Sequence, residues 1–482
     1  MFKTIQASWT KDADLPDRAF RLQMLGRVLD GTLYDALPHA FHEEKAPNDE
    51  YIPLRNRRPS SRYRLCRLVV DDSVSLLFSE GHFPDIECGT DEACKEAIRA
   101  LAKELRFNEL MIDAATRGSV GSVAILMRVL INRPFFEVMD TVYLTPTWDA
   151  NAPDTLAKVT ELYKIKGKDL NAAGYKVDDK AMYWFRREWD ADAEVWFVPQ
   201  IDSDQKEGKP PVKDAANTVQ HGLGFVPMVW IRNLPGGDKI DGACTFPNEC
   251  IDTNIEIDYQ LSQGGRALKY AGDPTLMIKE PAGGDNGSLV KGGGNAIVVA
   301  ENGDAKMLEI NGTATEAVIN FVRLLRELTI ESMHGNRAQG EKQTAPSGRA
   351  LELLNQQLIW LADKLRISYG EIGMVSLLTM LIKAHQKFPL KMKTGAKLPE
   401  IPANTEITLR WPAWYTPSMQ DMLDRANTLR TLCDSALLSR ETAIKVLAAE
   451  YDIEDAKAEL MLATADMEAR NAAAQVQAKI NE

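Results

Sequence analysis

Three residues that lie close together in the sequence could in principle hold a metal ion: His82, Cys88 and Cys94. Their spacings match no common structural zinc site, and no fourth ligand is evident. The chain has six cysteines, too few for a disulfide framework, so we expect reduced thiols and a reducing compartment. The sequence therefore predicts no metal and no other cofactor.

The motifs that mark common catalytic sites are missing. The sequence contains no Gly-x-x-x-x-Gly-Lys-Ser/Thr phosphate loop, no His-Glu-x-x-His zinc motif and no Gly-x-Ser-x-Gly nucleophile elbow. Gly222-Leu223-Gly224 lacks the third glycine of a dinucleotide loop and leads into Pro227. With six histidines in 482 residues, general bases are few, although carboxylates could serve. The sequence therefore favours a protein that is not an enzyme.

A run of six arginines without an acidic residue lies between positions 51 and 70: Arg55, Arg57, Arg58, Arg62, Arg64 and Arg67. Such a run is typical of a patch for nucleic acid or another acidic partner. It is equally found on a solvated or subunit-contact face, the interpretation that we favour. The whole chain has a formal net charge of −12, the opposite of a protein that grips DNA phosphates. Either DNA is not a ligand, or DNA passes the protein without sticking.

The length and hydropathy suggest a protein of several structural units. A chain of 482 residues usually folds into two to four units. No stretch approaches the roughly 20 uninterrupted apolar residues of a membrane span, and the first residues lack the apolar core of a signal peptide. We therefore expect folding in a cytoplasm.

Hydrophobic periodicity predicts a mixture of helices and strands in the first half of the chain. Helices are expected at 60–79 and 91–116, and a strand at 120–131. A β-hairpin is expected from 181–185 and 194–198, with a loop at 202–218 and an edge strand at 225–231.

The second half predicts long helices. One covers 246–270 with a polar stripe four residues apart at Asp252, Glu256 and Gln260. A small β-rich insertion at 271–312 separates it from a helix at 314–333, in which Arg323 and Glu327 are also four residues apart. A polar loop at 334–348 precedes a helix from Arg349 to about His385 that glycines should kink. A strand at 407–411 and a helical region at 418–480 complete the pattern, with a helix start at Ser439.

Five segments and their order resemble the portal proteins of tailed double-stranded-DNA phages, most closely the Gram-positive-phage-type portal family. The similar segments are Ala114–Gly121, His221–Pro227, Asn248–Gln260, Ser347–Leu351 and Ser439–Ala443. The resemblance covers the chain from about residue 60. It implies an α+β portal fold with a wing, a helical stem, a β-rich clip and a helical crown.

Mapped onto this chain, the resemblance gives the following organisation. Residues 1–245 would be the first part of the wing, 246–270 and 313–334 the stem helices, and 271–312 the clip. Residues 335–348 would be the tunnel loop, 349–417 the rest of the wing, and 418–482 the crown.

The resemblance also implies a function in the virion. Portal proteins form closed rings, usually of twelve subunits, at one capsid vertex, and they assemble in the host cytoplasm. Double-stranded DNA passes through the channel without sequence specificity during packaging and ejection. The terminase large subunit and then head-completion or tail adaptor proteins dock on the ring, which also meets the major capsid and scaffolding proteins. The alternatives are another phage head protein, such as a head-closure or minor capsid component, and, less favoured, an enzyme acting on nucleic acid.

Two sets of residues would then face the DNA. The tunnel-loop residues Asn336, Arg337, Gln339, Lys342 and Gln343 would touch the phosphate backbone, because residues 334–349 hold three basic residues against one acidic residue. The alternative is an exposed loop whose charges only solvate it. Asp252, Glu256, Gln260, Arg323 and Glu327 would line the channel in the stem. Equally, they could form the solvated face of helices whose apolar side packs on a neighbour.

Overall fold

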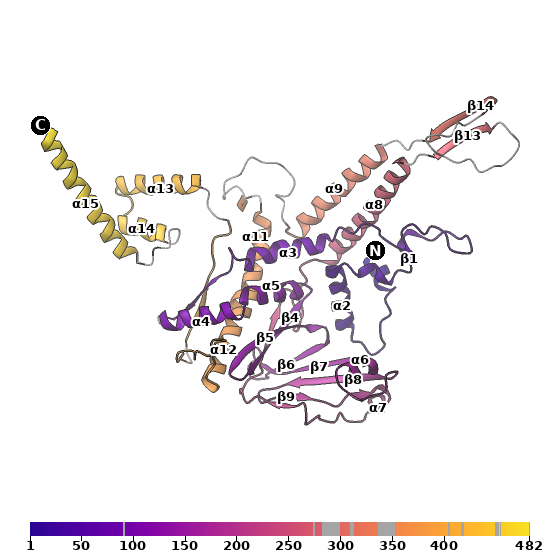
Figure 1. Ribbon diagram of the computed structural model, residues 1–482, viewed down its shortest axis with the longest axis horizontal. Coiled ribbons are helices and arrows are strands. Elements are labelled where there is room, and N and C mark those ends of the chain that lie inside the picture. Colours follow the sequence, from indigo (N-terminus) through magenta and orange to yellow (C-terminus); the bar gives the residue numbers. More distant parts are fainter. Residues whose placement is uncertain are drawn as a thin grey trace. The chain divides into compact units, whose positions relative to one another are not determined.

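The computed structural model divides into two compact units; the larger mixes helices and sheets, which agrees with the predicted α+β class, and the described part of the smaller is helical (Figure 1). The larger unit comprises Met1–Gln339 with Asn355–Ala413, and the smaller comprises Gly340–Leu354 with Trp414–Glu482. The structure describes residues 1–89, 92–272, 275–281, 299–308, 313–335, 352–353, 355–402, 405–415, 419–448, 453 and 455–481.

A three-stranded antiparallel sheet forms the centre of the larger unit, in the order β12 (Met228–Arg232), β4 (Ser122–Leu130), β5 (Arg133–Asp140). Every residue from Val123 to Met127 is buried, because β4 is covered on both faces. Ala124 and Leu126 belong to a cluster shared with the neighbouring larger sheet. The predicted strand at 120–131 is confirmed, and so is the edge position of the strand after Pro227.

A six-stranded antiparallel sheet packs beside it. The strands in order are β11 (Val219–Gln220), β9 (Ala193–Trp196), β8 (Met182–Trp189), β7 (Leu156–Lys166) and β6 (Leu144–Trp148), while β10 (Gln200–Ile201) pairs with β8. The predicted hairpin is confirmed as β8–β9, and the Asp190 carboxylate caps its turn by accepting the Asp192 and Ala193 N–H groups. The predicted loop at 202–218 instead begins with a short helix, α7 (Asp202–Lys206).

Four further helices belong to the larger unit: α2 (Asp17–Asp30), α3 (Leu65–Phe78), α4 (Glu92–Glu104) and α5 (Phe107–Gly118). Of these, α5 packs on β4 and β5, and α3 and α4 pack against α5. The helix predicted at 60–79 is confirmed as α3. The single helix predicted at 91–116 is wrong, because Arg106 adopts a left-handed conformation with φ of 51° and separates α4 from α5. Hydrophobic periodicity continues across such a break, so the sequence pattern did not reveal it.

A long interrupted helix crosses the larger unit. It consists of α11 (Gln356–Leu365), the π-helical segment η4 (Arg366–Met374) and α12 (Val375–Lys387). The irregularity expected at the glycines is the π-segment, where a Cβ on Gly370 would overlap the Trp411 ring and one on Gly373 would meet Ile231 at 2.7 Å. By length and composition alone this segment could cross a membrane, but 61% of its most apolar window is buried inside the structure. We therefore interpret it as a core helix.

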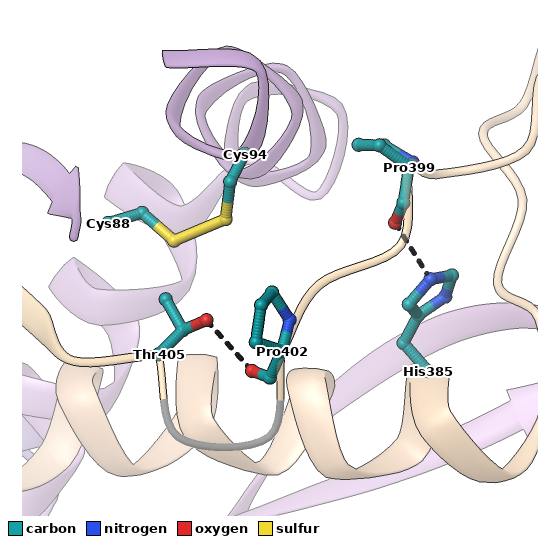
Figure 2. The surroundings of a disulfide bond; sticks show 6 residues. All are labelled: Cys88, Cys94, His385, Pro399, Pro402 and Thr405. Atoms are coloured by element: carbon teal, nitrogen blue, oxygen red, sulfur yellow. Dashed lines mark hydrogen bonds between the residues drawn. A yellow bond between two sulfur atoms is a disulfide. The ribbon is translucent and has the colours of Figure 1, made fainter. Parts of the chain in front are cut away.

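The last strand of the larger unit, β15 (Ile407–Arg410), pairs antiparallel with β3 (Asp85–Cys88) and confirms the strand predicted at 407–411. The Gly89 N–H donates to the Glu406 carbonyl. A disulfide joins Cys88 to Cys94 in the first turn of α4 (Figure 2). The expectation of six reduced thiols was therefore wrong for this pair. The turn from β3 to α4 brings their Cα atoms to 6.3 Å, within the range that a disulfide spans.

The remaining short elements of the larger unit are α1 (Phe2–Gln6), η1 (Leu33–Ala36), β1 (His39–Ala40), η2 (Leu54–Asn56), β2 (Arg57–Arg58), η3 (Thr141–Tyr143) and α6 (Gly167–Ala172). The smaller unit is helical, with α13 (Met419–Asp434), α14 (Arg440–Ala448) and α15 (Ala456–Asn481). The Ser439 hydroxyl accepts the Thr442 N–H at 3.2 Å, which confirms the predicted helix start.

Candidate functional site

The longest paired elements of the chain are two antiparallel helices, α8 (Asn248–Gly272) and α9 (Thr313–Ser332), which lie side by side (Figure 1). Near one end the Cys250 Sγ lies 3.5 Å from the Ser332 Oγ. Further along, Gly264 faces Val318 so closely that an added Cβ would be 3.2 Å from a Val318 methyl group. Both predicted long helices are confirmed, and so is their side-by-side packing.

Between these helices the chain forms a two-stranded antiparallel ribbon, β13 (Thr275–Pro281) with β14 (Val299–Leu308). These strands lie within the predicted β-rich insertion at 271–312. The helices and the ribbon together form one projecting element, which we call the α8–α9 hairpin (Figure 1).

One face of α8 is fixed to the rest of the larger unit by a ladder of side chains. Asn254, Asp258 and Ser262, all buried, accept hydrogen bonds from the backbone N–H groups of Leu65, Tyr63 and Ser61, with donor–acceptor distances of 2.6, 2.6 and 3.0 Å. The spacing of the three side chains along α8 matches the spacing of alternate N–H groups along residues 61–65. Four helical residues rise about 6 Å, and two residues of extended chain advance about 6.6 Å. A helix face thus satisfies alternate N–H groups of residues 61–65, as a neighbouring strand would.

Asp258 is the most buried charge in this ladder. Its carboxylate also accepts the Tyr34 hydroxyl at 2.7 Å and the Asn254 amide at 3.2 Å. Burial raises the pKa of Asp258 to about 6, against the opposing effects of the Tyr63 N–H, the Tyr34 hydroxyl and Arg62. The Tyr259 hydroxyl adds a bond to the Arg57 carbonyl at 2.9 Å. These contacts hold α8 in one orientation.

The predicted stripe on α8 lies on a different face. The Asp252 carboxylate contacts the Phe2 N–H at 2.5 Å and the Met1 ammonium at 3.0 Å. Burial raises the pKa of Asp252, but these hydrogen bonds lower it overall. Glu256 and Gln260 are half-buried and bond to each other at 2.7 Å. The three residues do share a stripe, but Asp252 is engaged by α1.

On α9, Arg323 and Glu327 are exposed, as both of their interpretations require. Beside them runs an apolar stripe at Phe321, Leu324 and Leu328, whose exposed fractions are 43, 51 and 54%. Another side of α9 buries Thr329 and Ile330, and Met333, which follows the helix, is buried too. The hairpin therefore presents large apolar side chains at helical spacing on a face that nothing covers in the described part of this single chain.

The predicted tunnel-loop residues Asn336, Arg337, Gln339, Lys342 and Gln343 lie outside the described residues, and so does most of 335–348. Their DNA contacts stay a prediction.

Three side chains of the arginine run bond to carbonyl groups of the same chain, while Arg55, Arg62 and Arg64 are exposed, so both interpretations of the run stay predictions. Arg57 is 1% exposed and donates to the Ile52 and Phe41 carbonyls. Arg62 donates to the Gly31 carbonyl and Arg64 to the Leu29 carbonyl, both near the end of α2. Arginines with fixed donor geometry suit this role, because each can satisfy several carbonyl groups. Within the described part of the chain, no group of three or more His, Cys, Asp or Glu residues could hold a metal ion.

The sequence missed the ladder although its spacing was visible. Asn254, Asp258 and Ser262 are also four residues apart, but they begin two residues after Asp252. Two positions rotate a helix by about 200°, so the two stripes point in nearly opposite directions. Periodicity alone could not decide which stripe would be buried.

Two solved structures are similar to the chain over most of its length. One is a chain of the virion of a native gene transfer agent particle, with 10% identity and a TM-score of 0.40, covering 93% of this chain and 98% of that chain. The other belongs to the neck of an empty gene transfer agent particle, with 10% identity and a TM-score of 0.38, covering 80% and 89%. No family model and no curated protein sequence matches the chain. Likeness at these TM-scores carries no argument about function.

Proposed function

We propose that this chain is a portal protein: one subunit of a ring whose axial channel conducts double-stranded DNA into and out of a phage-type capsid. The observation that carries the proposal is the uncovered apolar stripe on the α8–α9 hairpin, at Phe321, Leu324 and Leu328. Regularly spaced, exposed large side chains are typical of surfaces that another subunit buries. A second copy is the simplest cover, because a closed ring repeats one heterologous contact around its axis.

The parts of the chain then take the roles that the sequence resemblance implies. Residues 246–270 and 313–334 form the stem and 271–312 the clip. Residues 1–245 and 349–417 form the wing, 335–348 the tunnel loop, and 418–482 the crown. The ladder on α8 supports the stem assignment, because a stem helix in a ring must be held firmly to the rest of its own subunit.

The charge of the chain supports passage of DNA rather than tight binding. The formal net charge is −12, and a ring of twelve copies would multiply it. A negative wall repels phosphates and limits sticking. Arg337 and Lys342 in the tunnel loop would supply the non-specific backbone contacts. The terminase large subunit and later the head-completion or tail adaptors would dock on the clip, and the ring would reside at one vertex of the virion.

Imaging of the purified protein tests the proposal. Negative-stain electron microscopy should show rings with a central hole. The pair Leu324→Asp and Leu328→Asp should leave folded monomers, because two charges would enter the subunit contact. Val212→Asp, an equally drastic change at an exposed residue of a loop, is the matched control and should leave rings intact. Monomers or closed shells of the unaltered protein would contradict the proposal, as would normal rings of the double variant.

A further inference from the structure

A second basic cluster lies at the end of α12, far in sequence from the arginine run. Five lysines fall between residues 374 and 399 without one Asp or Glu: Lys383, Lys387, Lys391, Lys393 and Lys397. All except the half-buried Lys391 are exposed. In the part of the chain that the structure describes, none of the five ammonium groups takes part in an ion pair. In a chain of net charge −12, this is a local reversal of sign.

An apolar tip adjoins these lysines. Leu130 at the end of β4 and Ile131 in the turn to β5 are 55% and 95% exposed. Ile131 adopts a left-handed backbone with φ of 52°, which a β-branched residue rarely does and which Gly or Asn would adopt more easily. The Lys391 N–H donates to the Asn132 carbonyl at 2.8 Å, so the basic segment is attached to the tip. The turn thus holds an aliphatic side chain in solvent despite the conformational cost.

A pocket of about 600 Å³ lies behind the tip. Its lining includes Met127, Ile131, Leu223 and Phe388, and the edge strand β11 contributes Val219. Lys387 stands next to it, because a Cβ on Gly224 would lie 3.8 Å from the Lys387 Nζ. Two acidic residues lie at this surface. Glu104 accepts the Lys393 N–H at 2.8 Å and faces Arg133 at 3.6 Å, and Glu194 lines the pocket but pairs with Arg128 and Arg187. Apolar and basic features therefore form one surface, the lysine–tip surface, defined by the five lysines, Leu130, Ile131 and this pocket.

We propose that the lysine–tip surface binds an acidic segment of another protein, with an aliphatic or aromatic side chain of that segment in the pocket. Charge complementarity favours an acidic partner. Lysines without carboxylate partners attract Glu and Asp side chains, while the rest of this acidic chain repels them. The apolar tip and pocket select protein over nucleic acid. A phosphate backbone would leave Ile131 exposed, whereas a peptide side chain would cover it.

The probe is an array of short peptides that combine several Glu or Asp residues with one Leu, Ile or Phe, measured against the full-length protein at several salt concentrations. An array with Lys in place of every acid, an all-Glu peptide and a short DNA duplex are the comparison probes. Acidic peptides with an apolar residue should bind most tightly, and their affinity should fall with salt.

Two variants test the two halves of the surface. Lys387→Glu with Lys393→Glu should weaken binding at least about tenfold and remove its salt dependence. Ile131→Asn should weaken binding without harming the fold, because asparagine suits the left-handed turn. Lys168→Glu with Lys180→Glu, at exposed positions near α6, is the charge-matched control and should change nothing.

Three results would overturn the proposal. The first is equal affinity for the all-Glu peptide, which would make the tip irrelevant. The second is tighter binding of the DNA duplex that depends on the same lysines, which would identify a nucleic-acid surface. The third is that the lysine variants weaken the binding of none of the acidic peptides. Ring formation by the same variants is read separately by electron microscopy, so failure of the portal proposal is distinguishable.

Discussion

Replacing Asp258 with asparagine should remove a pH dependence from the attachment of α8 to residues 61–65. In the folded protein burial raises the pKa of this carboxyl to about 6, from an ordinary value of 3.8. The folded carboxyl therefore binds a proton at a pH where the opened segment does not. The stabilisation is fully present below pH 3.8 and is lost as the pH rises through 6.

The magnitude follows from the same two values. At pH 5, one unit below the folded pKa, the folded carboxyl is mostly protonated, and at pH 7.5 it is mostly charged. One unit corresponds to about 1.4 kcal/mol, so opening of this segment should be about tenfold rarer at pH 5 than at pH 7.5. Asp258→Asn carries no titrating group, so the difference should disappear. Tyr63 should keep a hydrogen-bond acceptor, because the amide oxygen of asparagine can replace the carboxylate oxygen.

Amide hydrogen exchange of a peptide covering residues 57–66, read as protection relative to the intrinsic rate at each pH, measures this opening directly. The local readout matters because burial also raises the pKa of Asp140 and Glu161, which makes the global stability depend on pH as well. The β4 strand serves as the internal control, since Asp258 makes none of its contacts. Equal pH dependence of the unaltered protein and Asp258→Asn in this peptide would refute the reasoning.

Two further predictions concern stability. Asp241→Ala removes the buried carboxylate that Arg18 contacts at 2.7 and 2.8 Å, and should cost about 3–5 kcal/mol in urea unfolding followed by tryptophan fluorescence. Asp71→Ala, at an exposed pair within α3, should cost less than about 1 kcal/mol, and equal effects would contradict the difference in burial. Cys88→Ser opens a disulfide that closes a loop of six residues and should cost about 2 kcal/mol in oxidising buffer. With excess dithiothreitol present the variant and the unaltered protein should unfold alike, and a difference that persists there would mean that the serine itself disturbs the fold.

The elements with strong local signals were predictable. Long helices such as α8 and α9 follow from apolar residues at helical spacing, and β12 was placed at a sheet edge because of Pro227. The start of α14 followed from Ser439, whose hydroxyl makes the expected cap. Errors occurred where the pattern continues through a local break, as at Arg106, and where two cysteines six residues apart meet across a turn.

The candidate site was only partly predictable. The sequence located the α8–α9 hairpin. It singled out Asp252, whose contacts are with α1, and it missed Asp258, which lies on a different face of α8. It also singled out the arginine run, in which Arg57, Arg62 and Arg64 bond to carbonyl groups of the same chain, and passed over five lysines at the end of α12. A charge count along the sequence cannot distinguish these two runs, because it does not include the backbone groups that each side chain meets.

By itself the sequence determined that long helices lie at α8 and α9, that a β-rich insertion separates them, and that the chain as a whole is acidic. Those properties depend on neighbours within a few residues and on simple sums. Only the tertiary structure decided which polar stripe of α8 is buried, which arginines bond to carbonyl groups of the chain, and which apolar residues of α9 remain uncovered. Each of these depends on contacts that the local pattern does not contain; the buried stripe of α8, for example, depends on the Tyr63–Asp258 contact between residues 195 positions apart, which is fixed by packing.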